Sequence, residues 1–207
     1  MKDIIVIGAG GHARIVASIL STQKDYNILE FVDIYIKYED EKINSIPVDE
    51  VKTIAGNLKK KKIKHIFLAV GYNEKRKNLY NELKDEYNFI NCIHPNAKIE
   101  SNSSVGRGVF IGSGAIIGAE VEISDNVIIN NGVIISHETK IGANSHLGPG
   151  VNIAGRVSIG DDTFIGIGSS IIDDLNIGDN VVIGAGSVVI DNIEDNVKVV
   201  GTPAKKI

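Results

Sequence analysis

The second half of the chain repeats its pattern of hydrophobic and polar residues with a period of six. Aliphatic residues recur in this frame from Ile99 to Val189 without an insertion, and Ile93 extends the frame backwards. Four residues after each aliphatic position from Ile99 to Leu147 stands a small or β-branched residue, such as Val109 or Thr139. Residues two apart on a strand face the same side, so the two series face one interior. The repeat predicts a parallel β-helix.

The residue three positions after each aliphatic residue is often Asn or Gly, and this pattern predicts where the coil turns. Three hexads per coil give about 18 residues, and five to six coils give a prism roughly 25 Å tall. Residues one and five positions after the aliphatic one should then face outward. Asn and Gly tolerate a left-handed backbone, so we expect positive φ where they fill the turn position. They do so at Asn102, Gly108, Gly114, Asn126, Gly132, Asn144, Gly150, Gly168, Asn180, Gly186 and Asn192.

The chain changes character near residue 92. Before it, aliphatic runs at 2–7, 27–33 and 64–70 predict buried strands, and helical patterns follow the first and third runs. We therefore expect an α/β, Rossmann-like domain over residues 1–92. An all-β parallel β-helix should follow it over residues 93–207.

A glycine-rich segment follows the first predicted strand. Gly8 to Ala13 reads GAGGHA, and Asp33 ends the second strand, which together match the dinucleotide-binding fingerprint. A domain of about 90 residues is too short for the six-stranded unit that a dinucleotide requires. A half-sized sheet suits a single nucleotide, whose phosphate would meet the helix that begins after Gly10. A plain strand–helix turn is the alternative interpretation of these glycines.

Charge and cysteine content exclude several classes of function. The net charge of −4 argues against a nucleic-acid partner, and we interpret the basic run Lys59–Lys62 as a solvated helix end. Cys92 is the single cysteine, which excludes a disulfide framework and a cysteine-based zinc cluster. No leader-like segment opens the sequence and no apolar run reaches membrane-spanning length. We expect a cytoplasmic protein with no membrane partner.

Candidate chemistry appears inside the repeat. His137 and Glu138 occupy a turn, where they would point away from the core, and His146 stands at an outward position. Glu138 replaces the usual Asn or Gly of the turn, as Glu120 and Arg156 do one coil away on either side. The alternative is that this edge uses another turn type and carries ordinary surface charges. Two histidines make a poor zinc ligand set, so we expect no metal. His65 lies at the start of the third predicted strand, and His94 lies at the junction between the two domains. We interpret both as structural.

Several motifs carry a resemblance that covers essentially the whole chain. The hexads resemble the left-handed β-helix of the hexapeptide-repeat acyltransferases. The N-terminal half is similar to one branch only, the sialic acid O-acyltransferase family with the bacterial nucleotide-sugar N-acetyltransferases that share its layout. The segments concerned are VIGAGGHARIV, AVGYNEKRK, SHETKIG and the ending VVGTPAKKI.

The resemblance implies which residues bind each substrate. The N-terminal domain would bind a nucleotide-sugar acceptor through Gly10, Gly11, His12, Asp33 and Gly71. Relatives often carry two acids in a row where Asp33 is followed by Ile34, which leaves the details of recognition open. The co-substrate acetyl-CoA would be bound by His146, Gly155, Ile167, Gly184 and Ala185.

An open prism face holds a ligand such as acetyl-CoA poorly, which agrees with the homotrimer that the resemblance implies. His12 would then reach the acceptor near a neighbouring prism.

The chemistry of acetyl-CoA suggests a mechanism. The thioester is activated already, but the acceptor needs a general base, and histidine suits that task near neutral pH. We assign His137 as the base and, as the family motif implies, Glu138 as the carboxylate that orients it. The acceptor would attack directly, because Cys92 lies outside the repeat that carries the site, and backbone N–H groups of the glycine-rich hexads would hold the oxyanion.

Three functions remain open at this point. The first is N-acetylation of a nucleotide-linked amino sugar, preferably a UDP-4-amino-4,6-dideoxy sugar, for bacterial glycan or nonulosonic-acid biosynthesis. The second is O-acetylation of a sialic acid, and the third is a non-catalytic β-helix scaffold. The phosphate-cradling glycines favour the first over the second, and the pair of His137 and Glu138 argues against the third.

Overall fold

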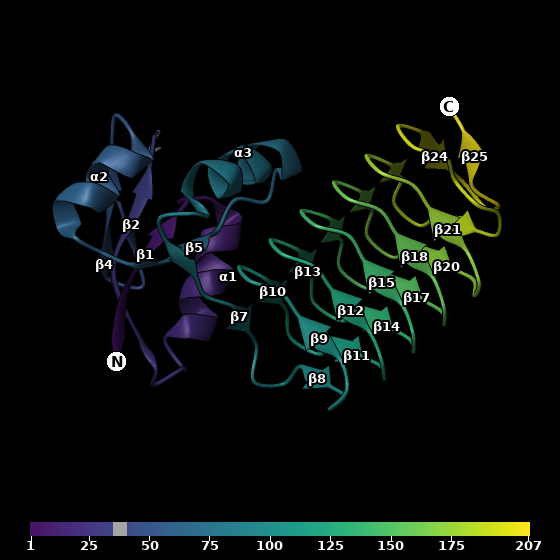
Figure 1. Cartoon of the computed structure of the whole chain (residues 1–207), viewed down its shortest axis with the longest axis horizontal. Helices are drawn as coiled ribbons and strands as arrows, with labels where there is room; N and C mark the ends of the chain where they lie inside the picture. Colours follow the sequence, from purple (N-terminus) through teal and green to yellow (C-terminus); the bar gives the residue numbers. More distant parts are fainter. Residues whose placement is uncertain (35–40) are drawn as a thin grey trace. The chain divides into compact units, whose positions relative to one another are not determined.

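A computed structural model describes residues 1–34 and 41–207 of the chain. These residues form two compact units, Met1–Cys92 and Ile93–Ile207, each with its own hydrophobic core (Figure 1). None of the described helices is long and apolar enough to cross a bilayer.

The N-terminal unit is built on a six-stranded sheet with the order β3-β4-β2-β1-β5-β6. Its strands are parallel except for the β3–β4 hairpin. The chain leaves β1 towards β2 on one side and returns to β5 on the other, which makes a switch point between β1 and β5 where α/β sheets bind ligands. The elements are β1 (Lys2–Ile7), α1 (Gly11–Leu20), β2 (Tyr26–Asp33), β3 (Lys42–Ile43), β4 (Ile46–Glu50), α2 (Ile54–Lys61), β5 (His65–Leu68), α3 (Asn73–Leu83) and β6 (Asn88–Phe89).

The sequence predicts the three long strands of this sheet and misses three others. Aliphatic runs mark β1, β2 and β5, whose residues Ile5, Val32 and Ile66 are fully buried. Strands β3 and β6 have two residues each, too few to show a pattern, and β4 contains a proline. The sheet is therefore larger than the half-sized sheet that the aliphatic runs predict. The basic run does lie at a helix end, because α2 ends at Lys61 and its last turn is basic.

The C-terminal unit is a three-sided parallel β-helix of two- and three-residue strands (Figure 1). We name each face after one of its strands. The β10 face contains β7 (Cys92–Ile93), β10 (Phe110–Ile111), β13 (Ile128–Ile129), β16 (His146–Leu147), β19 (Phe164–Ile165), β22 (Val182–Ile183), β24 (Lys198–Val200) and the antiparallel β25 (Lys205–Lys206). The β11 face contains β8 (Lys98–Ile99), β11 (Ile116–Ile117), β14 (Ile134–Ile135), β17 (Asn152–Ile153), β20 (Ser170–Ile171) and β23 (Val188–Val189). The β12 face contains β9 (Ser104–Val105), β12 (Glu122–Ile123), β15 (Lys140–Ile141), β18 (Ser158–Ile159) and β21 (Asn176–Ile177).

The register of this unit matches the predicted coil. Ile117 pairs with Ile135, and Ile135 with Ile153, which lies one coil further. The aliphatic residues and the residues four positions after them fill the interior. Buried hydroxyl groups also point inward and bond to the turns, as where the Ser145 hydroxyl donates to the Gly160 carbonyl at 2.8 Å. Each buried polar group of this kind thus has the partner it needs.

The turns have positive φ at most of the predicted positions. Glu120, Glu138 and Arg156 take the same conformation, with φ of 59°, 55° and 56°. The alternative of another turn type at this edge is therefore wrong. The prediction of positive φ is wrong at Asn102 and Asn192, which are not among the described residues with positive φ.

Both exceptions lie at the ends of the helix. In the first coil the Asn102 side chain accepts a hydrogen bond from the Glu120 N–H at 3.4 Å, whereas the Glu138 N–H one coil later donates to the backbone carbonyl of Ala119. Near Asn192 the last coil is shortened, because the Asn192 side chain accepts a hydrogen bond from Asn176, 16 residues back instead of 18. Phe110 and Ile128 stand at outward positions and lie outside the cluster that fills the interior, but both are buried.

Candidate active site

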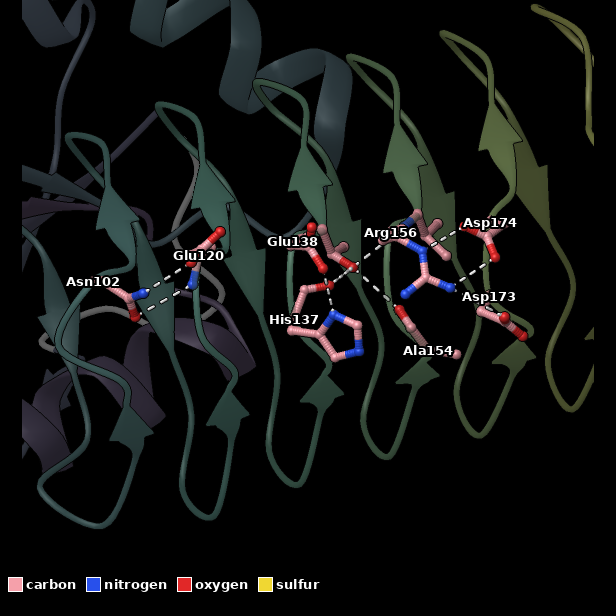
Figure 2. Close-up of polar contacts among 10 residues, drawn as sticks. Asn102, Glu120, His137, Glu138, Ala154, Arg156, Asp173 and Asp174 are labelled. Atoms are coloured by element: carbon pink, nitrogen blue, oxygen red, sulfur yellow. Dashed lines mark hydrogen bonds and ion pairs between the residues drawn. The ribbon is translucent and has the colours of Figure 1, made fainter.

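His137 and Glu138 form a close pair in the turn between β14 and β15, where the β11 face meets the β12 face. Nδ1 of His137 lies 2.9 Å from Oε2 of Glu138 (Figure 2). Both side chains are about half exposed, at 48% and 50%. An imidazole that donates through Nδ1 to a carboxylate has its Nε2 lone pair free to accept a proton. The turn therefore holds the components of a general base.

The backbone of this turn is fixed by the coils before and after it. The Arg156 N–H donates to the His137 carbonyl and the Glu138 N–H donates to the Ala119 carbonyl, both at 2.9 Å. The buried Thr139 hydroxyl donates to the Ala154 carbonyl at 3.1 Å. A base on such a rigid support keeps its position during the reaction.

A second charged pair lies one coil beyond. Arg156 donates from Nε and Nη2 to the two carboxylate oxygens of Asp174, at 2.6 and 2.8 Å (Figure 2). This hydrogen bonding holds the pKa of Asp174 below its ordinary value, and it raises the pKa of Arg156. The positive charge of Arg156 is thus already paired with a carboxylate.

The five predicted acceptor-binding residues lie around one pocket of the N-terminal unit. Its volume is about 610 Å³, and it opens at the switch point between β1 and β5. The pocket is lined by the loop after β1, by the end of β2 and by the loop after β5. The predicted residues on its wall are Gly10, Gly11, His12, Asp33 and Gly71.

Asp33 has a structural role in this pocket. Its carboxylate accepts hydrogen bonds from the N–H groups of Ala9, at 2.9 Å, and Ile34, at 2.8 Å. The side chain therefore fixes the glycine loop to the end of β2. Gly8 fixes the other side, because its φ is +110° and an added Cβ would lie 2.6 Å from the Ala69 carbonyl oxygen.

Gly10 and Gly11 differ from Gly8. Neither has positive φ, and an added Cβ at either would meet nothing within 4 Å. The fold of the unit does not explain these glycines. Gly10 is the N-cap of α1 without a side-chain cap, and the first turn carries no acidic residue. The helix N-terminus is therefore open to an anion, and the absent side chains leave space for one.

The pocket also has residues that the sequence analysis missed. Tyr72, Lys75, Asn78 and Leu79 line it from α3 and from the residue before it. Their spacing of three and four residues would have placed them on one helix face. Arg76, which is buried, supports the same wall by donating to the carbonyls of Val70 and Gly71 at 3.2 and 3.4 Å.

The residues predicted to bind acetyl-CoA lie on different sides of the prism. Gly155 shares the corner between the β11 and β12 faces with His137. Ile167, Gly184 and Ala185 lie in turns between the β10 and β11 faces. The structure of a single chain therefore does not bring these two groups together.

His146 lies on the β10 face, away from the corner of His137. It is half-buried and meets the ring of Phe164 edge-on, with 5.2 Å between ring centroids. His137 and His146 therefore lie on different sides of the prism in a single chain, because nine residues separate them and each coil turns through three faces.

No other group among the described residues suggests different chemistry. The described part of the chain holds no cluster of three or more His, Cys, Asp or Glu that could bind a metal. Cys92 is fully buried, and burial raises the pKa of its thiol well above the ordinary value. The Cys92 thiol is therefore a poor nucleophile.

Models of known protein families match both units. The model described as PglD N-terminal domain matches residues 3–83. Hexapeptide repeat of succinyl-transferase matches residues 98–137, and bacterial transferase hexapeptide (six repeats) matches residues 156–191. The comparison with curated protein sequences finds no match.

Solved structures align with the whole chain. PerB from Caulobacter crescentus, in complex with CoA and GDP-perosamine, is 32% identical, with 100% of this chain and 98% of that chain covered and a TM-score of 0.90. A histidine-to-asparagine variant of perosamine N-acetyltransferase from the same organism, with the same ligands, is 31% identical, with 100% and 97% covered and a TM-score of 0.92. The acetyltransferase domain of PglB from Neisseria gonorrhoeae FA1090, in complex with acetyl coenzyme A, is 28% identical, with 100% and 99% covered and a TM-score of 0.89. These matches confirm the predicted fold class, an α/β domain followed by a left-handed β-helix.

Proposed function

The chain belongs to the hexapeptide-repeat nucleotide-sugar N-acetyltransferases, and we propose that it acetylates the amine of a nucleotide-linked 4-amino-4,6-dideoxy sugar for glycan biosynthesis. It is an acetyl-CoA-dependent sugar acetyltransferase. The observation that carries the proposal is the pair of His137 and Glu138, joined at 2.9 Å on a rigid turn. This pair argues against a non-catalytic scaffold.

The reaction proceeds by direct transfer. The neutral sugar amine attacks the thioester carbonyl of acetyl-CoA, and Nε2 of His137 takes the proton that the nitrogen loses as the tetrahedral intermediate forms. The C–S bond of the tetrahedral intermediate then breaks, and the thiolate of CoA takes the proton from the imidazolium. The carboxylate of Glu138 orients the ring and stabilises its protonated form. Cys92 takes no part, since its thiol is buried.

The N-terminal pocket suits a nucleotide-linked acceptor. The diphosphate lies against the open N-terminus of α1 at Gly10 and Gly11, and the side chain of His12 lines the same wall. Ile34 and Leu79 offer apolar contact to a base. We favour UDP as the nucleotide, and the GDP-perosamine bound to PerB makes GDP the second nucleotide to test.

A homotrimer completes the site. In one chain, His137 and Gly155 lie at one corner of the prism, and Ile167, Gly184 and Ala185 lie at the next. If two copies pack side by side, one corner of each can border a common groove. Acetyl-CoA would lie in that groove, and three copies in a ring would form three equal sites. We place the reaction in the cytoplasm.

A panel of acceptors tests this function. Release of CoA thiol would be followed with UDP- and GDP-linked 4-amino-4,6-dideoxy sugars, free sialic acids and CMP-sialic acid. Release with an amino nucleotide-sugar alone supports the proposal, while release with sialic acids alone refutes it in favour of O-acetylation. Native mass spectrometry tests the trimer, and a fully active monomer would refute that part of the proposal.

A further inference from the structure

Gly155 lies directly against the imidazole of His137, one coil further along the same corner. An added Cβ at Gly155 would lie 2.5 Å from Cε1, 2.6 Å from Nε2 and 3.1 Å from Nδ1 of the ring. The three nearest atoms all belong to the imidazole. The ring therefore lies across the position that a side chain at residue 155 would occupy. Figure 2 shows the ring turned towards the next coil, on the side of Ala154.

The turn itself does not require a glycine at this position. Gly155 is the one glycine found two residues after an aliphatic position in the frame from Ile99 to Val189. Equivalent positions hold alanine at Ala119 and Ala143. The φ of Gly155 is not among the positive values, so its backbone suits any residue.

Other glycines of the β-helix are required because the backbone of the next coil lies too close for a side chain. An added Cβ at Gly142 or Gly166 would lie within 2.5 Å of a backbone atom of the next coil. Those glycines allow the coils to stack. Gly155 instead leaves room for one side chain, and that side chain is the proposed base.

We propose that Gly155 is a positioning residue for His137. By lacking a side chain, it allows the imidazole to lie flat against the next coil, with Nδ1 on Glu138 and Nε2 directed to the acceptor amine. This positioning role differs from the binding of acetyl-CoA that the family resemblance implies for Gly155. The catalytic consequence depends on the proposed function, whereas the geometric consequence does not.

Gly155→Ala should leave the fold intact and displace the ring. Alanine fits this position of the turn, as Ala119 and Ala143 demonstrate. The imidazole is the end of a flexible side chain, so the ring moves before the backbone does. Its contact with Glu138 is then lost, and the base no longer has its productive orientation.

Kinetics separate positioning from cofactor binding. We expect Gly155→Ala to lower kcat roughly tenfold to a hundredfold, with an unchanged KM for acetyl-CoA. Ala143→Gly, the reverse change at the same position of another corner, should leave both constants unchanged. A raised KM for acetyl-CoA with an unchanged kcat would overturn the proposal and make Gly155 a cofactor contact. Wild-type values of both constants would overturn it as well.

Two measurements test the geometry without any acceptor. Imidazole NMR signals, assigned with His137→Ala, should shift in Gly155→Ala for His137 and stay in place for His146. Thermal unfolding should show that Gly155→Ala lowers Tm more in the wild type than in the His137→Ala background, where no ring remains to be displaced. Unshifted His137 signals, or equal changes of Tm in both backgrounds, would overturn the proposal. Absence of acetyl transfer by the wild type would instead refute the proposed function and leave these two measurements valid.

Discussion

Nδ1 of His137 lies 2.9 Å from a carboxylate oxygen of Glu138, although the two residues are adjacent in the chain. In a strand, neighbouring side chains point to opposite faces and could not meet in this way. The contact depends on the turn, where the φ of +55° at Glu138 lets the two side chains converge. A conformation that L-residues rarely adopt is thus used to bring a carboxylate to an imidazole.

Glu138→Gln should lower kcat about tenfold, because an amide oxygen can accept from Nδ1 but lacks the charge that stabilises the imidazolium. The matched control is Glu120→Gln. Glu120 has the same turn position and a φ of 59°, but it follows Ala119 and not a histidine. Steady-state kinetics of both variants check the prediction. Equal losses in the two would mean that the corner responds to charge in general and not to the pairing with His137.

Gly11→Ala should separate stability from activity. An alanine at the start of α1 meets no atom within 4 Å and removes the entropic cost of glycine, so we expect a gain of about 0.5–1 kcal/mol in the free energy of unfolding. The added methyl group should nevertheless raise the KM for the nucleotide sugar roughly tenfold, while the KM for acetyl-CoA stays the same. Urea unfolding and initial-rate kinetics provide both values. An unchanged KM for the nucleotide sugar would show that the phosphate does not bind at this loop.

The repeat made the C-terminal fold predictable in unusual detail. Because the pattern of Ile, Val and Gly has a fixed period, it specifies the coil length, the interior and most of the turns. It fails at Asn102 and Asn192 because an end coil has a neighbouring coil on one side only. The residues themselves are the same at the ends and in the middle, so the pattern cannot reveal the difference.

The candidate site was less predictable for a geometric reason. The sequence indicates that His137 and His146 are outward residues of a repetitive stretch, but each hexad turns the chain to another face. Linear proximity therefore says little about which residues share a side of the prism. The contact between His137 and Gly155 was predictable in principle. Gly155 is the one glycine that stands two residues after an aliphatic position of the repeat, and it lies one coil of 18 residues after His137.

Cys92 should be unreactive in the folded protein. Its side chain is fully buried, and burial raises the pKa of the thiol, so little thiolate exists at neutral pH. We expect no labelling by a thiol reagent before unfolding, and full kcat for Cys92→Ala with a loss of roughly 1–2 kcal/mol in stability. Loss of acetyl transfer in this variant, at a temperature where it is folded, would contradict direct transfer and indicate an acyl-enzyme.

The pairing of Asp174 with Arg156 predicts a dependence of stability on pH. The hydrogen bond from Arg156 holds the pKa of Asp174 in the folded state below that in the unfolded state, which is about 4. The stabilisation is therefore full above pH 4 and is lost as the pH falls through the lowered pKa. We expect Asp174→Asn to be slightly less stable than the wild type at pH 7, with a difference that shrinks in acid. The effect is small because both side chains are exposed. Thermal unfolding at pH 7 and pH 3 checks this, and an equal difference at the two values would contradict it.

The most direct test of the central claim follows the acetyl group itself. Wild type and His137→Ala would be mixed with acetyl-CoA and a UDP- or GDP-linked amino sugar, and the product identified by mass spectrometry and NMR over time. We predict that the wild type forms the amide at the sugar nitrogen, and that His137→Ala, with its β-helix intact by circular dichroism, does so about 10²- to 10⁴-fold more slowly. A variant as fast as the wild type, or a product acetylated at a hydroxyl group, would contradict the assignment of His137 as the base of an N-acetyltransferase.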